Sequence, residues 1–261
     1  MATLAGALCG VLGVFVVLRG MSYIGHGLSH AVFGGAAASA VMKLNYFVGA
    51  GIWGVLSGVI IGRITRRRLI GADAAIGVVT TASFASGLAL LNRYGQAKKS
   101  IEAVLFGSVL GVGRSDIIAV ALVGILTVGI IVGLYRQFVF ATFDPEVAQV
   151  SGVRVAVIEA VLMGLLSLTI LVTMRVIGTL LISALLVIPA SIARMLTNSF
   201  AKMLWISPII GAVSAFVGMN LAYHIDTSAS ATIILMGTAI FIVVYAVTGV
   251  RGRARIGHVH V

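Results

Sequence analysis

The chain alternates between long apolar stretches and short segments that are polar or basic. A helix needs about 20 apolar residues, or somewhat fewer at the short limit, to cross a bilayer. The stretches therefore predict an all-α, polytopic membrane protein whose single domain covers residues 1–261. We expect nine transmembrane helices, near residues 2–18, 24–42, 46–62, 72–91, 116–134, 155–174, 176–194, 203–223 and 230–249.

Two shorter segments do not fit as spans. Residues 101–112 are apolar but too short to cross, so we expect a re-entrant or half-span helix there. Residues 143–153 have mixed character, and we expect a short helix on the cytoplasmic surface, where a soluble partner could contact it. Asp144 can cap this helix, Pro145 suits its first position, and Gly152 can end it.

The composition agrees with a protein that is dissolved in lipid. Hydrophobic residues make up 60% of the chain and charged residues only 10%. A water-soluble domain carries about 25% charged residues. A soluble fold of this size could not bury so much apolar surface, and the bilayer is the solvent in which such a composition is stable.

Lys and Arg residues are concentrated in alternate loops. If the densest cluster, residues 63–68, is cytoplasmic, then twelve of the 18 Lys and Arg residues lie inside. This positive-inside bias predicts an outer N-terminus and a cytoplasmic basic tail, residues 251–261. The net charge of +11 could instead indicate a nucleic-acid partner, but the positive residues sit in short clusters between apolar stretches, so we expect none.

Small residues recur at four-residue spacing on two of the predicted spans. Gly54, Gly58 and Gly62 share one face of the third span, and residues 34, 38 and 42 share one face of the second. Such stripes allow helix backbones to approach closely. We expect packing within the chain, with a subunit interface as the alternative.

Two histidines stand out in the second predicted span. His26 and His30 are four residues apart, so both imidazoles project from one face of a helix and can bind one ion. If the helix starts near Met21, His30 lies roughly 13 Å along it, close to the depth at which transport sites occur. Ser29 adds a neighbouring hydroxyl. The alternative is that both histidines only hydrogen-bond to neighbouring helices.

Other ionisable residues have simpler explanations. His224 and Asp226 share the last outer loop and could receive a cation, although we favour a turn in which Asp226 caps the last span. Glu159 lies about one turn into the sixth span, and we expect an interfacial residue near Arg154. The chain has no G-x-x-x-x-G-K-[ST] run for binding ATP, and we expect no enzymatic activity.

Four motifs, in order, resemble those of the ABC-3 family of zinc, manganese and iron permeases. The family's early G-D-G-L-S-H-A run is matched within residues 21–31 (MSYIGHGLSHA), and its L-F-G-S-x-L-G run at residues 105–111. The D-x-E-x-A-x-x-x-G stretch is matched by Asp144, Glu146, Ala148 and Gly152. The G-x-L-L-x-x-A-L-L-x-I-P-A run is matched at residues 178–190.

The resemblance implies a permease of the vitamin B12-type (type II) ABC importer fold in the bacterial plasma (inner) membrane. Two copies, or this chain and a sister permease, would form the pathway. ATPase subunits would dock inside, with residues 143–153 as the coupling helix, and an extracellular or periplasmic metal-binding protein would dock outside. The metal would be coordinated in transit at the positions of His26 and His30, with no permanently bound cofactor. Zn²⁺, Mn²⁺ or Fe²⁺ would pass through as cargo.

One departure from the family pattern bears on the cargo. The family's early Asp is His26 here, which replaces a negative charge by a borderline-soft nitrogen ligand. This change suits zinc or iron better than manganese, so we expect zinc. A permease for a metal chelate of the siderophore or cobalamin type is an alternative, as is a membrane transporter or scaffold outside the ABC class.

Overall fold

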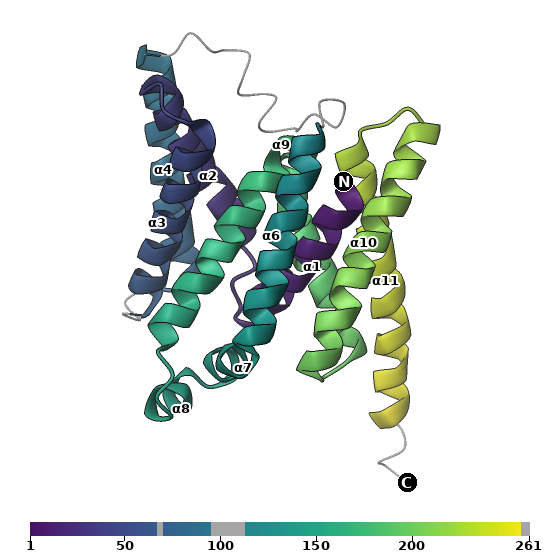
Figure 1. Ribbon diagram of the computed structural model, residues 1–261. Coiled ribbons are helices and arrows are strands. Elements are labelled where there is room, and N and C mark those ends of the chain that lie inside the picture. The colour runs from purple at the N-terminus through teal and green to yellow at the C-terminus, as the bar shows by residue number, and fades with distance from the viewer. Residues whose placement is uncertain (67–69, 95–112, 257–261) are drawn as a thin grey trace. The chain divides into compact units, whose positions relative to one another are not determined.

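The computed structural model describes residues 1–66, 70–94 and 113–256 (Figure 1). Every regular element in these ranges is a helix, which confirms the all-α prediction. The helices are α1 (Ala2–Leu18), α2 (Ile24–Val41), α3 (Tyr46–Arg66), α4 (Ala72–Tyr94), α6 (Arg114–Gly133), α7 (Tyr135–Phe143), α8 (Pro145–Val150), α9 (Val155–Leu196), α10 (Phe200–His224) and α11 (Ala229–Ile256). The predicted half-span at 101–112 lies outside the described residues.

The prediction of nine spans is not confirmed. Within the described ranges, six helical stretches are long and apolar enough to cross a membrane. Two further apolar helices, Ala2–Leu18 and Leu181–Leu196, are shorter. The helix α2 is not among the six, because glycine, serine and two histidines dilute its apolar residues. The multi-pass character of the protein is nevertheless clear.

The sixth and seventh predicted spans are joined without a loop. They form α9, which is broken only at Gly178, where φ is 77° and ψ is 159°. A positive φ of this size is accessible to glycine at little cost and strained for other residues. The predicted spans 155–174 and 176–194 put the break at residue 175, whereas the structure places it at Gly178.

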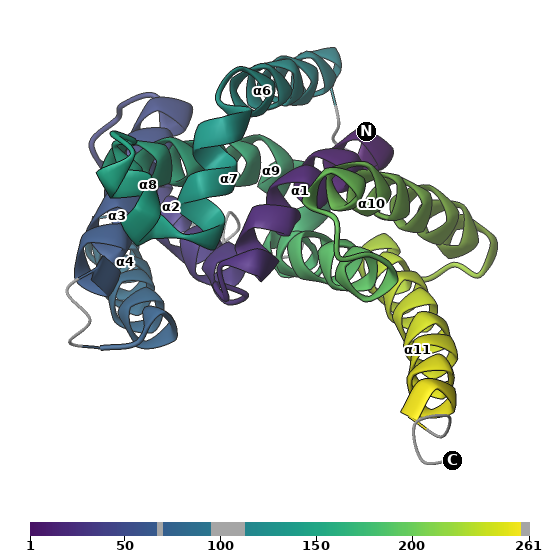
Figure 2. The ribbon, with the colours of Figure 1, turned by 90° about the horizontal axis from the view of Figure 1, so that it is seen from below.

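The chain forms two compact units, and the first contains residues 18–183. In it, α2 packs against both α3 and α4 (Figures 1 and 2). The α3 glycines lie against the early part of α9 at matching intervals: a Cβ on Gly54 would lie 3.2 Å from Ser167 Cβ, and one on Gly58 would lie 2.8 Å from Met163 Cβ. Packing within the chain, as predicted for this stripe, is thereby confirmed.

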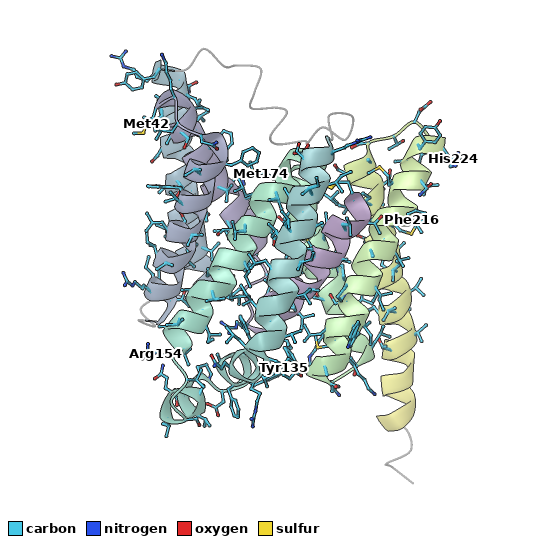
Figure 3. The ribbon with its side chains drawn as sticks, in the orientation of Figure 1. Met42, Tyr135, Arg154, Met174, Phe216 and His224 are labelled. Atoms are coloured by element: carbon cyan, nitrogen blue, oxygen red, sulfur yellow. The ribbon has the colours of Figure 1, made fainter. Side chains whose placement is uncertain are left out.

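The first unit has two well-defined ends. Tyr135 and Arg154 lie at the end that carries α7 and α8, and Met42 and Met174 lie at the opposite end (Figure 3). The predicted orientation makes the α7–α8 end cytoplasmic. This orientation stays a prediction.

The second unit contains α1, the later part of α9, α10 and α11. Glycines on α1 allow close packing, since Gly6 meets the backbone of Gly211 on α10 and Gly13 meets the backbone of Leu186 on α9. The Ser207 hydroxyl of α10 donates to the Gly10 carbonyl at 2.7 Å. The backbone of α11 continues to Ile256, into the range predicted as a basic tail, and residues 257–261 are outside the described ranges.

Candidate functional site

The two histidines of α2 come together as their spacing predicts. The Nε2 atoms of His26 and His30 are 3.1 Å apart, and their ring planes are inclined by 87°. His26 is exposed and His30 is half-buried. Two imidazole nitrogens that share one tetrahedral metal ion at 2.0–2.1 Å are about 3.3 Å apart. The separation of the two nitrogens is therefore close to that of two ligands of one ion, and it equally fits a hydrogen bond between the rings.

An aromatic side chain of α4 packs against the His30 ring. The ring of Phe84 meets the His30 ring edge to face, with centroids 4.9 Å apart, and also lies 5.1 Å from the ring of Phe33. The Nδ1 atom of His30 is buried without a hydrogen-bond partner. The neighbouring hydroxyl of Ser29 is buried and donates to the Gly25 carbonyl at 2.7 Å, so it is not directed at the pair.

Glycines bring α2 and α4 close on either side of His30. A Cβ on Gly27 would lie 2.9 Å from Thr80 Cγ2, and one on Gly34 would meet the backbone carbonyl of Ser83. Bulkier residues at these two positions would separate the helices and move Phe84 away from the histidine. These two glycines thus allow the close approach of α4 that brings Phe84 to the His30 ring.

His26 and His30 together offer a metal ion two side-chain ligands. Among the described residues, no group of three or more His, Cys, Asp and Glu side chains could hold a metal ion. Water or backbone carbonyls would complete the coordination.

His224 and Asp226 lie at the end of α10 and in the turn that follows it. Both are exposed, and Asp226 has a φ of 49°. His224 is labelled in Figure 3. The prediction that Asp226 caps the last span was wrong, because α11 begins at Ala229 and Ser228 precedes it. Asp226 instead occupies the left-handed turn, a conformation that Asp tolerates better than most residues.

The predicted cytoplasmic helix is present as α8. The Asp144 carboxylate accepts a hydrogen bond from the Val147 amide at 2.9 Å, and Pro145 occupies the first position. Gly152 follows the helix with a φ of 82°. Within α8, Ala148 is fully buried, whereas Val150 is 91% exposed, so one face is anchored and the other is free for a partner.

A hollow of about 430 Å³ lies beside α8. Its lining comes from α7, from the α8–α9 connection and from the first turn of α9: Gln137, Ser151, Gly152, Val153, Arg154, Val157 and Ile158. The hollow and the exposed face of α8 lie side by side at the α7–α8 end of the first unit.

Sequence reasoning missed two features of the first unit. Phe84 is an ordinary apolar residue in the sequence, and no signal there marks its contact with His30. Arg19 was counted only as a loop cation, yet it is half-buried, and its Nε donates to Thr142 Oγ1 at 3.3 Å. Its position directly after an apolar stretch was the one available signal.

Comparison with known proteins identifies the class. The model of the ABC 3 transport family matches residues 1–248, and the chain belongs to this family. The protein is thus a multi-pass transport protein of the plasma membrane, as the motifs predicted.

The chain is also similar to individual transport proteins and to a solved structure. The chain is 35% identical to the manganese transport system membrane protein MntC of Listeria innocua over 240 residues, which are 92% of this chain and 85% of that protein. It is 33% identical to the "Probable iron transport system membrane protein" of Haemophilus influenzae, covering 97% of this chain and 93% of that one. The solved structure of PsaBC from Streptococcus pneumoniae in complex with Fab superposes with a TM-score of 0.82 at 33% identity, over 94% of this chain and 88% of that one.

Proposed function

We propose that this chain is the permease subunit of an ABC importer for a divalent metal ion, and that His26 and His30 bind the ion in transit. The observation that carries the proposal is the 3.1 Å separation of the two Nε2 atoms on a helix of the membrane domain. Ionisable side chains are costly within a membrane and are usually functional there.

The cargo is better argued from relatives than from ligand type. Our sequence-based preference for zinc rested on His26, and the names of the relatives do not support it, since they specify manganese and iron. Iron satisfies both arguments, because Fe²⁺ accepts imidazole and is the cargo named for one relative. We therefore place iron and manganese ahead of zinc.

The partners follow from the class of transporter. The chain has no phosphate-binding loop, and we expect separate ATPase subunits to supply the energy, with the exposed face of α8 as their contact. A metal-binding protein would deliver the ion outside, and a second copy or a sister permease would complete the pathway. The histidine pair would then bind the ion in alternating access, exposed first to one side and then to the other.

Cellular metal content tests the proposal. Cells that lack this gene would be complemented with the native chain, His30→Ala or Ser86→Ala, and their manganese, iron and zinc would be measured by mass spectrometry under metal limitation. We expect the native chain and Ser86→Ala to restore one metal, and His30→Ala to fail, because the loss of one of two ligands removes the shared site. Ser86 is a matched control because its hydroxyl only donates to the Ala82 carbonyl of its own helix.

The outcomes separate the alternatives. Uptake of one metal that is equal for His30→Ala and the native chain would leave the family assignment intact and remove the histidine site. If no metal changes on deletion, cargo of the metal-chelate type, or a role outside ABC import, becomes the better explanation.

A further inference from the structure

A row of four rings runs along the interface of α2 and α4 and contains both histidines of the candidate site. The centroids of the His26 and His30 rings are 4.6 Å apart, and the His30 ring is followed by Phe84 at 4.9 Å. Phe84 is followed by Phe33 at 5.1 Å. Three of these residues belong to α2, and Phe84 comes from α4. Phe84 therefore lies against His30 and Phe33 together and joins the candidate ligand to the neighbouring helix.

The far side of the His30 ring has no hydrogen bond to hold it. Histidines that bind a metal almost always donate their second ring N–H to a carboxylate, a carbonyl or water, and this bond fixes the orientation of the ring. The Nδ1 atom of His30 is instead buried without a hydrogen-bond partner. The orientation of the ring on that side therefore depends on the side chains that pack against it.

Close packing between the helices gives Phe84 a defined position. A Cβ on Gly34 of α2 would meet the Ser83 carbonyl, and a Cβ on Gly87 of α4 would lie 2.7 Å from the Gly34 Cα. Phe33 is only 4% exposed, so the inner neighbour of Phe84 belongs to the core. The Phe84 and His30 rings are inclined by 76°, close to the edge-to-face arrangement that aromatic pairs prefer.

We propose that Phe84 is a positioning residue that keeps Nε2 of His30 directed at the metal ion, in place of the hydrogen bond that most metal-binding histidines have. The inference rests on the proposed function, in which His30 is a ligand. Phe84 itself does not touch the ion and acts through the imidazole. An aliphatic side chain would still fill the space between α2 and α4, but it would not favour one inclination of the His30 ring.

Zinc binding to the purified full chain in detergent tests this role. Zn²⁺ is the probe because imidazole sites bind it more tightly than Mn²⁺ or Fe²⁺. In Phe84→Leu and in Phe84→Met we expect the dissociation constant to rise by about tenfold or more, since loss of a group that orients a ligand typically weakens metal binding by about ten- to a hundredfold. Phe84→Tyr retains the ring and should bind as the native chain does. Native affinity in both aliphatic variants would overturn the proposal.

A double variant shows whether Phe84 acts through His30. We expect Phe84→Leu to have no further effect in a chain that already carries His30→Ala, because the residue that it positions is absent. Two losses that multiply would overturn the proposal. If His30→Ala binds Zn²⁺ as tightly as the native chain, the proposed metal site itself fails. If His30→Ala weakens binding and neither aliphatic variant at position 84 does, only the role of Phe84 fails.

Phe200→Leu is the matched control for lost aromatic packing. Phe200 of α10 and Phe15 of α1 form a similar pair in the second unit, with centroids 5.5 Å apart and ring planes inclined by 72°. Phe84→Leu and Phe200→Leu should both lower the midpoint of thermal unfolding, but only Phe84→Leu should weaken Zn²⁺ binding. Equal weakening by the two variants would show that general loss of packing sets the affinity, and the proposal would be overturned.

Discussion

The chemistry of the candidate site depends on a few side chains of α2 and α4. Helical spacing brings the His26 and His30 nitrogens within 3.1 Å, and Phe84 covers the His30 ring from α4. The histidine pair is predictable from the sequence because both members lie on one helix, and four residues make slightly more than one turn. The depth was less predictable: α2 begins at Ile24 and not near Met21, so His30 lies about 9 Å along it.

His26→Asp should retune the metal preference. A carboxylate oxygen is a harder ligand than imidazole and carries a negative charge, which favours manganese. We expect the ratio of manganese to zinc uptake to rise by about tenfold, the equivalent of about 1.4 kcal/mol. The measurement is uptake from an equimolar mixture of the two ions.

Ser22→Asp is the control for this change, since it adds the same charge at an exposed position before α2. It should leave the ratio near that of the native chain. An equal shift in both variants would show that general electrostatic attraction, and not coordination at position 26, sets the preference.

At the level of the helices, glycines lie where helix surfaces approach one another most closely. The α3 stripe packs on the early part of α9, and glycines of α1 meet the backbones of α9 and α10. The stripes are visible in the sequence, but their partners are not, because a small residue permits close approach to any apolar helix. The break in α9 at Gly178 was equally hidden, since glycine is common throughout this chain and few of the glycines that the structure describes have a positive φ.

Gly58→Ala should destabilise the protein. The added Cβ would lie 2.8 Å from the Met163 Cβ, so α3 and α9 must separate. Overpacking of this kind costs about 1–3 kcal/mol. Thermal unfolding in detergent measures the effect as a lowered midpoint.

Gly77→Ala on α4 is the matched change, because nothing lies within 4 Å of its Cβ position. It should be neutral or stabilising by up to about 1 kcal/mol, since alanine is the better helix former. A loss of stability at position 58 no larger than at position 77 would contradict close packing of α3 on α9.

At the scale of the molecule, function requires that the two ends of the first unit face opposite sides of the membrane. Met42 and Arg154 lie at opposite ends (Figure 3), and α8 lies at the Arg154 end. The positive-inside bias predicts that the α8 end is cytoplasmic, where ATPase subunits would reach it.

Single-cysteine labelling tests this orientation. The native chain has one cysteine, the buried Cys9, which would be replaced by alanine. Met42→Cys and Val150→Cys would then each place one thiol at a site that is 67% and 91% exposed, respectively. We expect a membrane-impermeant maleimide to label position 42 in intact cells, and position 150 only after permeabilisation. The reverse pattern would invert the topology and exclude α8 as a contact for cytoplasmic ATPases.

The amino-acid sequence sufficed for much of what depends on local order or on composition. The bilayer environment, most helix positions, the cap at Asp144 and the spacing of the histidine pair all belong to this group, because each involves neighbours along the chain or the average polarity of a stretch. Contacts between distant segments required the folded structure. Thr142 lies far along the chain from Arg19, and Phe84 is one apolar residue among many in α4. Such contacts depend on which helix faces are brought together, and the order of residues along the chain does not specify the partner.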